Sequence, residues 1–155
     1  MLAVVQRVAH AHVTADGQES GRIARGLLAL VGIHRDDADA DALWLADRLL
    51  GLRVFPDPAG KMNLNAAQAG AGLLMVPNFT LCASTGKGHR PGFDAAMHPD
   101  RARPLFLRLL ELLTTPADPA RAVPIAAGVF GADMAIHMHA DGPVTLILDS
   151  SARAR

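Results

Sequence analysis

Short apolar runs separated by turn residues dominate the first third of the chain, and this spacing predicts strands. Residues 2–8 form one apolar run. Residues 26–33 form a second, continuous run bounded by glycine and charge, which is typical of a fully buried strand. Between these runs, Asp16-Gly17 is a strong hairpin signal. We therefore expect strands joined through a tight hairpin in this region.

Two segments carry apolar residues at helical spacing instead. Residues 37–50 follow the acidic pair Asp36-Asp37, which is favourable at a helix start, and repeat apolar positions three and four residues apart. The second segment opens at Pro99 and ends at Thr114-Thr115-Pro116. The pattern predicts two amphipathic helices.

The remaining apolar runs predict further strands, two of which contain proline. Strands are expected over residues 52–55, 62–64 and 73–82, then over 134–139 and the stretch that follows it. Pro77-Asn78 and Gly142-Pro143 interrupt these runs. A central strand avoids such residues, because proline has no N–H for the ladder and glycine has no side chain to pack.

Many strands with two helices, and no regular alternation between them, favour an α+β fold over a doubly wound sheet. A chain of 155 residues fits one domain. We expect a single compact domain over residues 1–150, with a mostly antiparallel or mixed sheet forming a barrel-like core, and a flexible tail over 151–155.

Composition and charge exclude several classes of protein. Half of the residues are hydrophobic, yet no apolar run approaches twenty residues, which predicts a soluble protein without a membrane span. Fifteen basic side chains balance fifteen acidic ones, so any contact with nucleic acid must be local. The one candidate is the glycine-spaced basic loop 86–92, for which a solvated turn is the alternative. A single cysteine, Cys82, forms no internal disulfide, as expected in a reducing cytoplasm.

The chemical candidates are few. His10 with His12, and His137 with His139, lie two residues apart and could each present two imidazoles on one strand face, but no Cys/His cluster supports a metal and a solvated face is favoured. We expect no metal. Thr80, Ser84 and Thr85 are possible nucleophiles with His89 as a possible base, although sequence proximity is weak evidence. No dinucleotide fingerprint or phosphate loop occurs, so no nucleotide cofactor is indicated.

Six short motifs carry a resemblance that periodicity does not reveal. They are VVQRV (4–8), GKMNL (60–64), NFTL (78–81), KGHRPGF (87–93), GVFGADM (128–134) and DGPVTLILDS (141–150). With these motifs in this order, the whole chain resembles the D-aminoacyl-tRNA deacylase family.

The resemblance implies a cytoplasmic homodimeric enzyme, without cofactor, that hydrolyses the ester joining a D-amino acid or glycine to the terminal adenosine of a tRNA. This activity proofreads chirality in translation. No membrane or DNA partner is expected. In the family, the pair matching Gly142-Pro143 has a cis peptide bond and enters the partner subunit's active site, where rigid backbone would collide with an L-side chain. Arg7 matches the arginine that fixes this loop.

The resemblance also implies roles for other residues. Backbone N–H groups near Phe79 and Thr80 polarise the ester carbonyl, and the 2′-hydroxyl of the tRNA helps to activate water. A rival scheme makes Thr80 a covalent nucleophile. The catalytic residues expected on this basis are Asn78, Phe79, Thr80, Gly142 and Pro143. Those expected to bind substrate or tRNA are Arg7, Pro77, Lys87, His89, Arg90, Phe130, Gly131, Met134, Val144 and Thr145.

Within the second set, we expect Lys87, His89 and Arg90 to contact the acceptor end of the tRNA. Phe130 and Met134 are expected to line a pocket for the terminal adenosine, with a place in the buried core as the alternative.

One motif departs from the family pattern. The family usually has Ser-Gln-Xaa-Thr-Leu where this chain has Pro77-Asn78-Phe79-Thr80-Leu81. A sister family of animal tRNA deacylases has proline at the first of these positions, together with a trans Gly-Pro bond and relaxed chirality. A deacylase of altered chirality or substrate specificity, and a non-catalytic tRNA-binding homologue, are therefore the alternatives.

Overall fold

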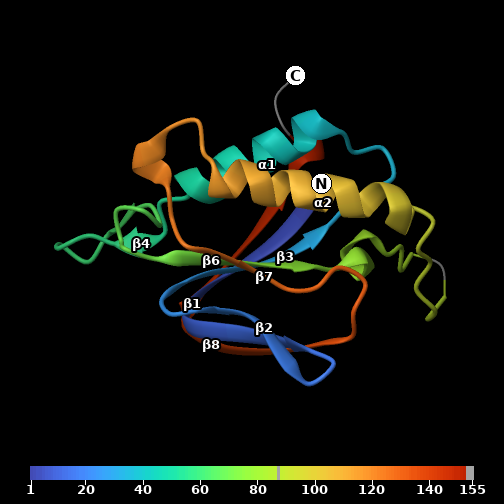
Figure 1. Cartoon of the computed structure of the whole chain (residues 1–155), viewed down its shortest axis with the longest axis horizontal. Helices are drawn as coiled ribbons and strands as arrows, with labels where there is room; N and C mark the ends of the chain where they lie inside the picture. The colour runs from blue at the N-terminus through green and yellow to red at the C-terminus, as the bar shows by residue number, and fades with distance from the viewer. Residues whose placement is uncertain (87, 153–155) are drawn as a thin grey trace.

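Eight strands and two α-helices make up residues 1–86 and 88–152, the part of the chain that this computed structural model describes (Figure 1). The helices are α1 (Asp39–Gly51) and α2 (Pro99–Thr114). The strands are β1 (Leu2–Ala15), β2 (Gln18–Ile23), β3 (Gly26–Gly32), β4 (Phe55–Pro56), β5 (Met62–Leu64), β6 (Gly72–Pro77), β7 (Ile125–Ala127) and β8 (Met134–Asp149). Three 3-10 turns complete these residues: η1 (Phe79–Cys82), η2 (Pro119–Arg121) and η3 (Ser150–Ala152).

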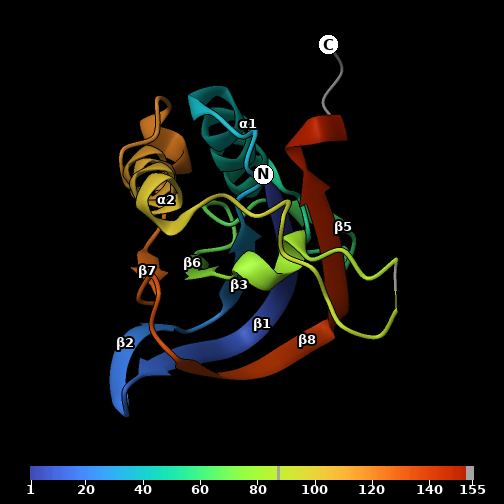
Figure 2. The ribbon, with the colours of Figure 1, turned by 90° about the vertical axis from the view of Figure 1, so that its right-hand side faces the viewer.

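The long strand β1 organises the main sheet. Its first half pairs with β3 and its second half with β2, while β8 runs antiparallel along its other edge through both halves. Beyond β3 the ladder continues in parallel through β6 to β7. Because β1 pairs along one edge first with β3 and then with β2, the sheet curls (Figure 2). The predicted α+β fold with a mixed, barrel-like sheet is confirmed.

Both helices cover the same face of this sheet, and the core fills the space between them (Figure 2). Leu45 and Leu49 of α1 and Phe106 and Leu109 of α2 are each at most 1% exposed. Each such side chain contributes about 1.5–3 kcal/mol through burial. A second, smaller cluster packs between β1, β2, β3 and β6 and closes the interior of the curled sheet.

The tight hairpin and the second helix agree with their predicted positions. Asp16 and Gly17 both have positive φ, 50° and 77°, as a two-residue turn between β1 and β2 requires. The first helix starts two residues later than expected. Residues 62–64 form β5 as predicted.

Other predicted strands differ from the structure. The strand expected over 52–55 is reduced to Phe55–Pro56, where the Val54 carbonyl instead accepts a hydrogen bond from Arg7. The strand expected over 73–82 ends at Pro77, and the two last strands are one continuous β8. The short β7 was not predicted, since three residues carry too little periodicity to be recognised.

At the carboxyl end, Ser151 and Ala152 of the predicted tail belong to η3, and residues 153–155 lie outside the described part of the chain. Within the described residues, neither helix is long and apolar enough to cross a bilayer.

Close approach of two backbones makes Gly26 a sensitive position. It is paired with Gly72 where β3 begins to run beside β6, and a Cβ at residue 26 would stand 2.2 Å from the Gly72 carbonyl oxygen. We expect Gly26→Ala to lower the free energy of unfolding by roughly 3 kcal/mol, because backbone cannot move aside as a side chain can. Urea unfolding measures the effect. Gly86→Ala is the matched control, since nothing lies within 4 Å of its Cβ position; equal midpoints for the two variants would contradict the prediction.

Candidate functional site

The turn that follows β6 is held by the side chain of Asn78. The Asn78 N–H still donates to the Val31 carbonyl (2.7 Å), so the chain leaves the sheet only after this residue. Its side-chain Oδ1 then accepts from the Thr80 N–H (3.2 Å) and the Thr80 hydroxyl (2.5 Å). Asn78 is thus the N-cap of η1, as short polar side chains are at helix starts.

This capping leaves one amide of the turn available. The first N–H groups of any helix lack an acceptor within it. Asn78 satisfies that of Thr80, whereas the N–H of Phe79 has no acceptor inside η1. The Phe79 side chain is 60% exposed, so this edge of the turn faces outward. The Phe79 N–H is therefore the donor that η1 can offer to a ligand.

A cavity of about 450 Å³ lies on one side of the turn, and its walls are mostly apolar. The ends of β3 and β6 form its floor, α2 contributes one wall through Ala102, and Phe130 and Gly131 contribute another. The lining also includes Phe79, Phe93 and the segment 96–99. A cavity of this size and polarity suits a planar organic ring system.

A second cavity, of about 280 Å³, lies against the same turn. Pro77, Asn78, Phe79 and Gly131 line both cavities, and the smaller one extends to β8 through residues that include Met134. The η1 turn therefore stands between two adjoining spaces.

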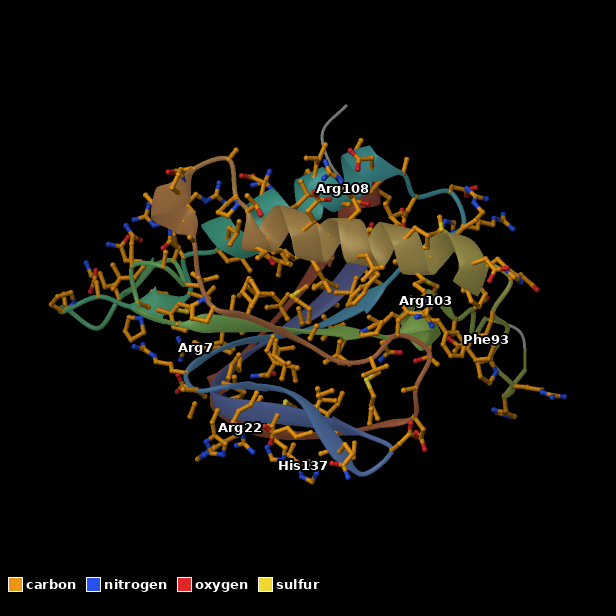
Figure 3. The ribbon with its side chains drawn as sticks, in the orientation of Figure 1. Arg7, Arg22, Phe93, Arg103, Arg108 and His137 are labelled. Atoms are coloured by element: carbon orange, nitrogen blue, oxygen red, sulfur yellow. The ribbon has the colours of Figure 1, made fainter. Side chains whose placement is uncertain are left out.

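Two hydrogen bonds hold the segment that carries Phe93 against β3. The Met97 N–H donates to the Ile33 carbonyl and the Arg35 N–H to the Ala95 carbonyl, both at 2.9 Å. Phe93, labelled in Figure 3, then packs on Phe79, and the centroids of the two rings are 5.1 Å apart. These contacts form the outer wall of the larger cavity, a role that the sequence analysis did not give to Phe93.

The basic loop begins directly beside this wall. Ser84 and Gly92 exchange two backbone hydrogen bonds of 2.8 and 2.9 Å, which close the loop at its base. His89 and Arg90 are exposed on it. Lys87, also expected to bind tRNA, lies outside the described residues.

Arg7 is buried, at 9% exposure, and reaches the residue before Gly142. Its Nε lies 3.0 Å from Oδ2 of Asp141 and donates to the Asp141 carbonyl at 3.3 Å, while Nη1 donates to the Val54 carbonyl at 2.5 Å. The β1–β8 register shifts at this point, so that residues 141–144 bulge out opposite Arg7. Gly142 and Pro143 are exposed.

The expected cis bond is wrong for this structure. The described residues contain no cis peptide bond, so Gly142–Pro143 is trans. Gly142 has φ of +114°, a conformation open to glycine, and this supplies the bend that takes residues 141–144 out of the ladder. The trans form before proline is favoured by about 0.5–1 kcal/mol when nothing else selects the isomer.

Most of the predicted site residues thus fall into two groups, while Thr80 lines neither cavity and His89 and Arg90 lie exposed on the basic loop. Pro77, Asn78, Phe79, Gly131 and Met134 meet around the two cavities, and Phe130 lines the larger one. Neither cavity is lined by Arg7, Gly142, Pro143, Val144 or Thr145, although the Thr145 hydroxyl does donate to the Gln6 side chain.

The two histidine pairs and Cys82 line neither cavity. His10 faces His139 edge-on and His12 stacks on His137 across β1 and β8, and among the described residues no three side chains are grouped to hold a metal ion. Cys82 lies in η1 and not in a strand as expected. Burial, followed by the negative charge of Asp37, raises the pKa of the Cys82 thiol, which opposes thiolate chemistry.

Comparison with known proteins confirms the family resemblance. Residues 4–149 match the family model described as D-Tyr-tRNA(Tyr) deacylase. A curated relative from Geobacter sulfurreducens, named D-aminoacyl-tRNA deacylase, is 44% identical over 99% of this chain and 98% of its own length. One from Alkalilimnicola ehrlichii with the same name is 48% identical, with 99% of each chain covered.

Solved structures give the same result for the fold. The structure titled c-Myc DNA Unwinding Element Binding Protein superposes with a TM-score of 0.87 at 37% identity and covers 96% of this chain and 98% of its own. A probable eukaryotic D-amino acid tRNA deacylase superposes with a TM-score of 0.76 at 17% identity, covering 95% and 97%, and it supports the fold alone.

The cap at Asn78 gives a direct test of this geometry. Asn78→Ala removes the acceptor of the Thr80 N–H, and we expect amide hydrogen exchange at Thr80 to accelerate about fivefold, because such a cap is worth about 1 kcal/mol. Asn78→Asp retains a side-chain oxygen and should preserve the slower exchange. Identical exchange in the alanine and aspartate variants would show that the side chain does not cap the turn.

Proposed function

We propose that this chain, which belongs to the D-Tyr-tRNA(Tyr) deacylase family, uses the turn between its two cavities to hydrolyse the ester of D-aminoacyl-tRNA. The enzyme is a hydrolase that releases the amino acid and the tRNA. The family match over nearly the whole chain is the observation that supports this reaction. The position of η1 between the cavities supports the site.

The two cavities suit the two ends of the ester. The larger, apolar cavity fits the terminal adenosine, whose base would lie among Phe79, Phe93 and Phe130. The smaller cavity would then receive the aminoacyl group beside Met134. The scissile carbonyl falls between them, next to the Phe79 N–H.

Catalysis at this position relies on a fixed backbone donor. The Phe79 N–H polarises the carbonyl and stabilises the oxyanion, a contribution of about 2.7–4 kcal/mol for one preorganised donor. The Thr80 N–H does not share this role, because it already donates to the side-chain Oδ1 of Asn78. The 2′-hydroxyl of the terminal ribose helps to activate water.

A covalent role for Thr80 has less support. Its hydroxyl donates to the amide oxygen of Asn78, which is not a base. A nucleophilic hydroxyl needs a general base within hydrogen-bond reach to take its proton. We therefore assign Thr80 to the support of the turn.

Selection of chirality is proposed to need a second copy of the chain. The Gly142–Pro143 loop is exposed, and it lines neither cavity of its own chain. Strand β8 also exposes Met138 (52%) and Ile147 (71%), apolar side chains that an interface would cover. In a homodimer, the loop of one protomer would present main-chain oxygens to the site of the other, in an orientation set by Arg7, and would exclude L-side chains.

The substrate also needs contacts outside the cavities. Arg90 and His89 project from the loop closed by Ser84 and Gly92, next to the larger cavity, and with Lys87 they are proposed to meet the acceptor end of the tRNA. A tRNA substrate would place the enzyme in the cytoplasm.

Altered specificity is a second candidate, and two observations favour it. Pro77 and Asn78, where the family has serine and glutamine, line both cavities, and the Gly142–Pro143 bond is trans as in the animal sister family. Such a site would accept glycine or a small L-residue.

Hydrolysis of three substrates decides between these candidates. The D-specific enzyme is expected to cleave D-Tyr-tRNA and Gly-tRNA and to cleave L-Ala-tRNA roughly a hundredfold more slowly, because a steric clash is hard to relieve in a rigid site. Single-turnover measurements at equal enzyme concentration give the rates. Comparable rates for L-Ala-tRNA would establish the altered specificity, and tRNA binding without cleavage of any substrate would refute the enzymatic proposal.

Replacement of Thr80 separates the two mechanisms. Under backbone catalysis, Thr80→Ala should reduce single-turnover hydrolysis of D-Tyr-tRNA by no more than about tenfold, whereas loss of a nucleophile costs on the order of 10⁶. Thr80→Ser keeps the hydroxyl and serves as the control. Loss of all activity in the alanine variant, with the serine variant active, would contradict the backbone mechanism.

A further inference from the structure

Arg103, an exposed residue of α2, reaches the loop that forms one wall of the larger cavity. Its Nη2 donates to the Phe130 carbonyl at 3.1 Å, and its guanidinium carbon lies 5.3 Å from the centre of the Phe130 ring. In Figure 3 the Arg103 side chain lies below α2, on the same side of the molecule as Phe93. One side chain therefore contacts both the backbone and the ring of Phe130.

No carboxylate accounts for the position of Arg103. Within residues 1–86 and 88–152 it forms no ion pair, unlike Arg108 one turn later, which is held by Asp39 and Glu111. An exposed arginine without an acidic partner is ordinarily free to sample many rotamers. Its observed conformation is explained by Phe130, since a planar guanidinium stacks on an aromatic face and donates at its edge at the same time.

The Phe130 loop has few other restraints. The Gly128 N–H donates to the Met75 carbonyl at 2.9 Å, which ties the start of the loop to β6. Gly131 has φ of +82°, and the Phe130 ring touches buried Phe106 from one side, with centroids 6.1 Å apart. The Ala132 N–H also donates to the Val129 carbonyl at 3.3 Å, which closes a turn around Phe130. Arg103 is the side chain that contacts both the carbonyl and the ring of Phe130 in this turn.

The loop matters because it belongs to both cavities. Phe130 and Gly131 line the larger one, and Gly131 also lines the smaller one. A shift of the Phe130 ring would change the space for a stacked base without affecting the Phe79 N–H. A change at this wall should therefore alter the binding of the substrate without altering the rate of the chemical step.

We propose that Arg103 is a positioning residue for the nucleoside end of the substrate: it clamps Phe130 in the place where the terminal base stacks. This inference rests on the proposed function, because it assigns the larger cavity to the adenosine. It predicts a defect in substrate binding and not in the chemical step.

Steady-state kinetics on D-Tyr-tRNA test the clamp. Arg103→Ala is expected to raise KM roughly tenfold, since a hydrogen bond and a cation–π contact are both lost, while kcat stays within about twofold. Arg103→Lys keeps the charge but not the planar fork, and should recover only part of the loss. Arg101→Ala is the matched control: it removes the same charge from the same helix at a residue that borders a different, shallow groove beside Pro104 and Arg108.

Hydrogen exchange without substrate gives a readout independent of activity. In Arg103→Ala, we expect the amides of residues 129–132 to exchange several-fold faster than in the wild type and in Arg101→Ala. A KM equal to that of Arg101→Ala would overturn the inference, and so would full recovery by Arg103→Lys or unchanged exchange in the loop. If the wild-type enzyme cleaved no aminoacyl-tRNA, the proposed function would fail, and exchange would still decide whether Arg103 clamps the loop.

Discussion

A proline at the end of an interior strand is the constraint on which the site depends. Strand β6 lies between β3 and β7; its pairing with β7 ends at Met75, whereas its pairing with β3 continues to Pro77, which has no N–H to donate. The Asn78 N–H still donates to the Val31 carbonyl, and the chain then leaves the sheet into η1, which Asn78 caps. Pro77 and Asn78 line both cavities, so the end of this strand is the boundary at which the proposed mechanism holds the ester.

A second constraint is the burial of Arg7. A buried guanidinium is costly unless its donors are satisfied, and here Asp141 and the Val54 carbonyl satisfy them. The β1–β8 ladder opens around this group, and Gly142–Pro143 is pushed outward as a consequence. Buried Arg7 therefore lies directly opposite the exposed Gly142–Pro143 bulge of β8.

These two constraints act on different parts of the chain. The turn after β6 borders both cavities, whereas the bulge of β8 exposes Gly142 and Pro143 and lines neither cavity. In the proposed mechanism a second protomer joins the two parts. The turn of one chain hydrolyses the ester, and the loop of the neighbouring chain excludes L-amino acids. Arg103 is proposed to act independently of these two constraints. It contacts Phe130 in the wall of the larger cavity and does not contact the Phe79 N–H.

Local features of the sequence predicted much of this fold, while contacts between distant segments decided the site. Some features depend on residues that are close together in the chain, so one sequence suffices to recognise them. These are the Asp16-Gly17 hairpin, the buried run at β3, the helix opened by Pro99 and the six family motifs. Only the tertiary structure decided four other features. The last two strands join into β8, β7 forms, and the Gly142–Pro143 bond is trans. Phe93, Ala102 and Phe130 also meet at one cavity. Each of these depends on partners far away along the chain, such as Arg7 for Asp141 or Ile33 for Met97, and no local periodicity encodes such a pairing.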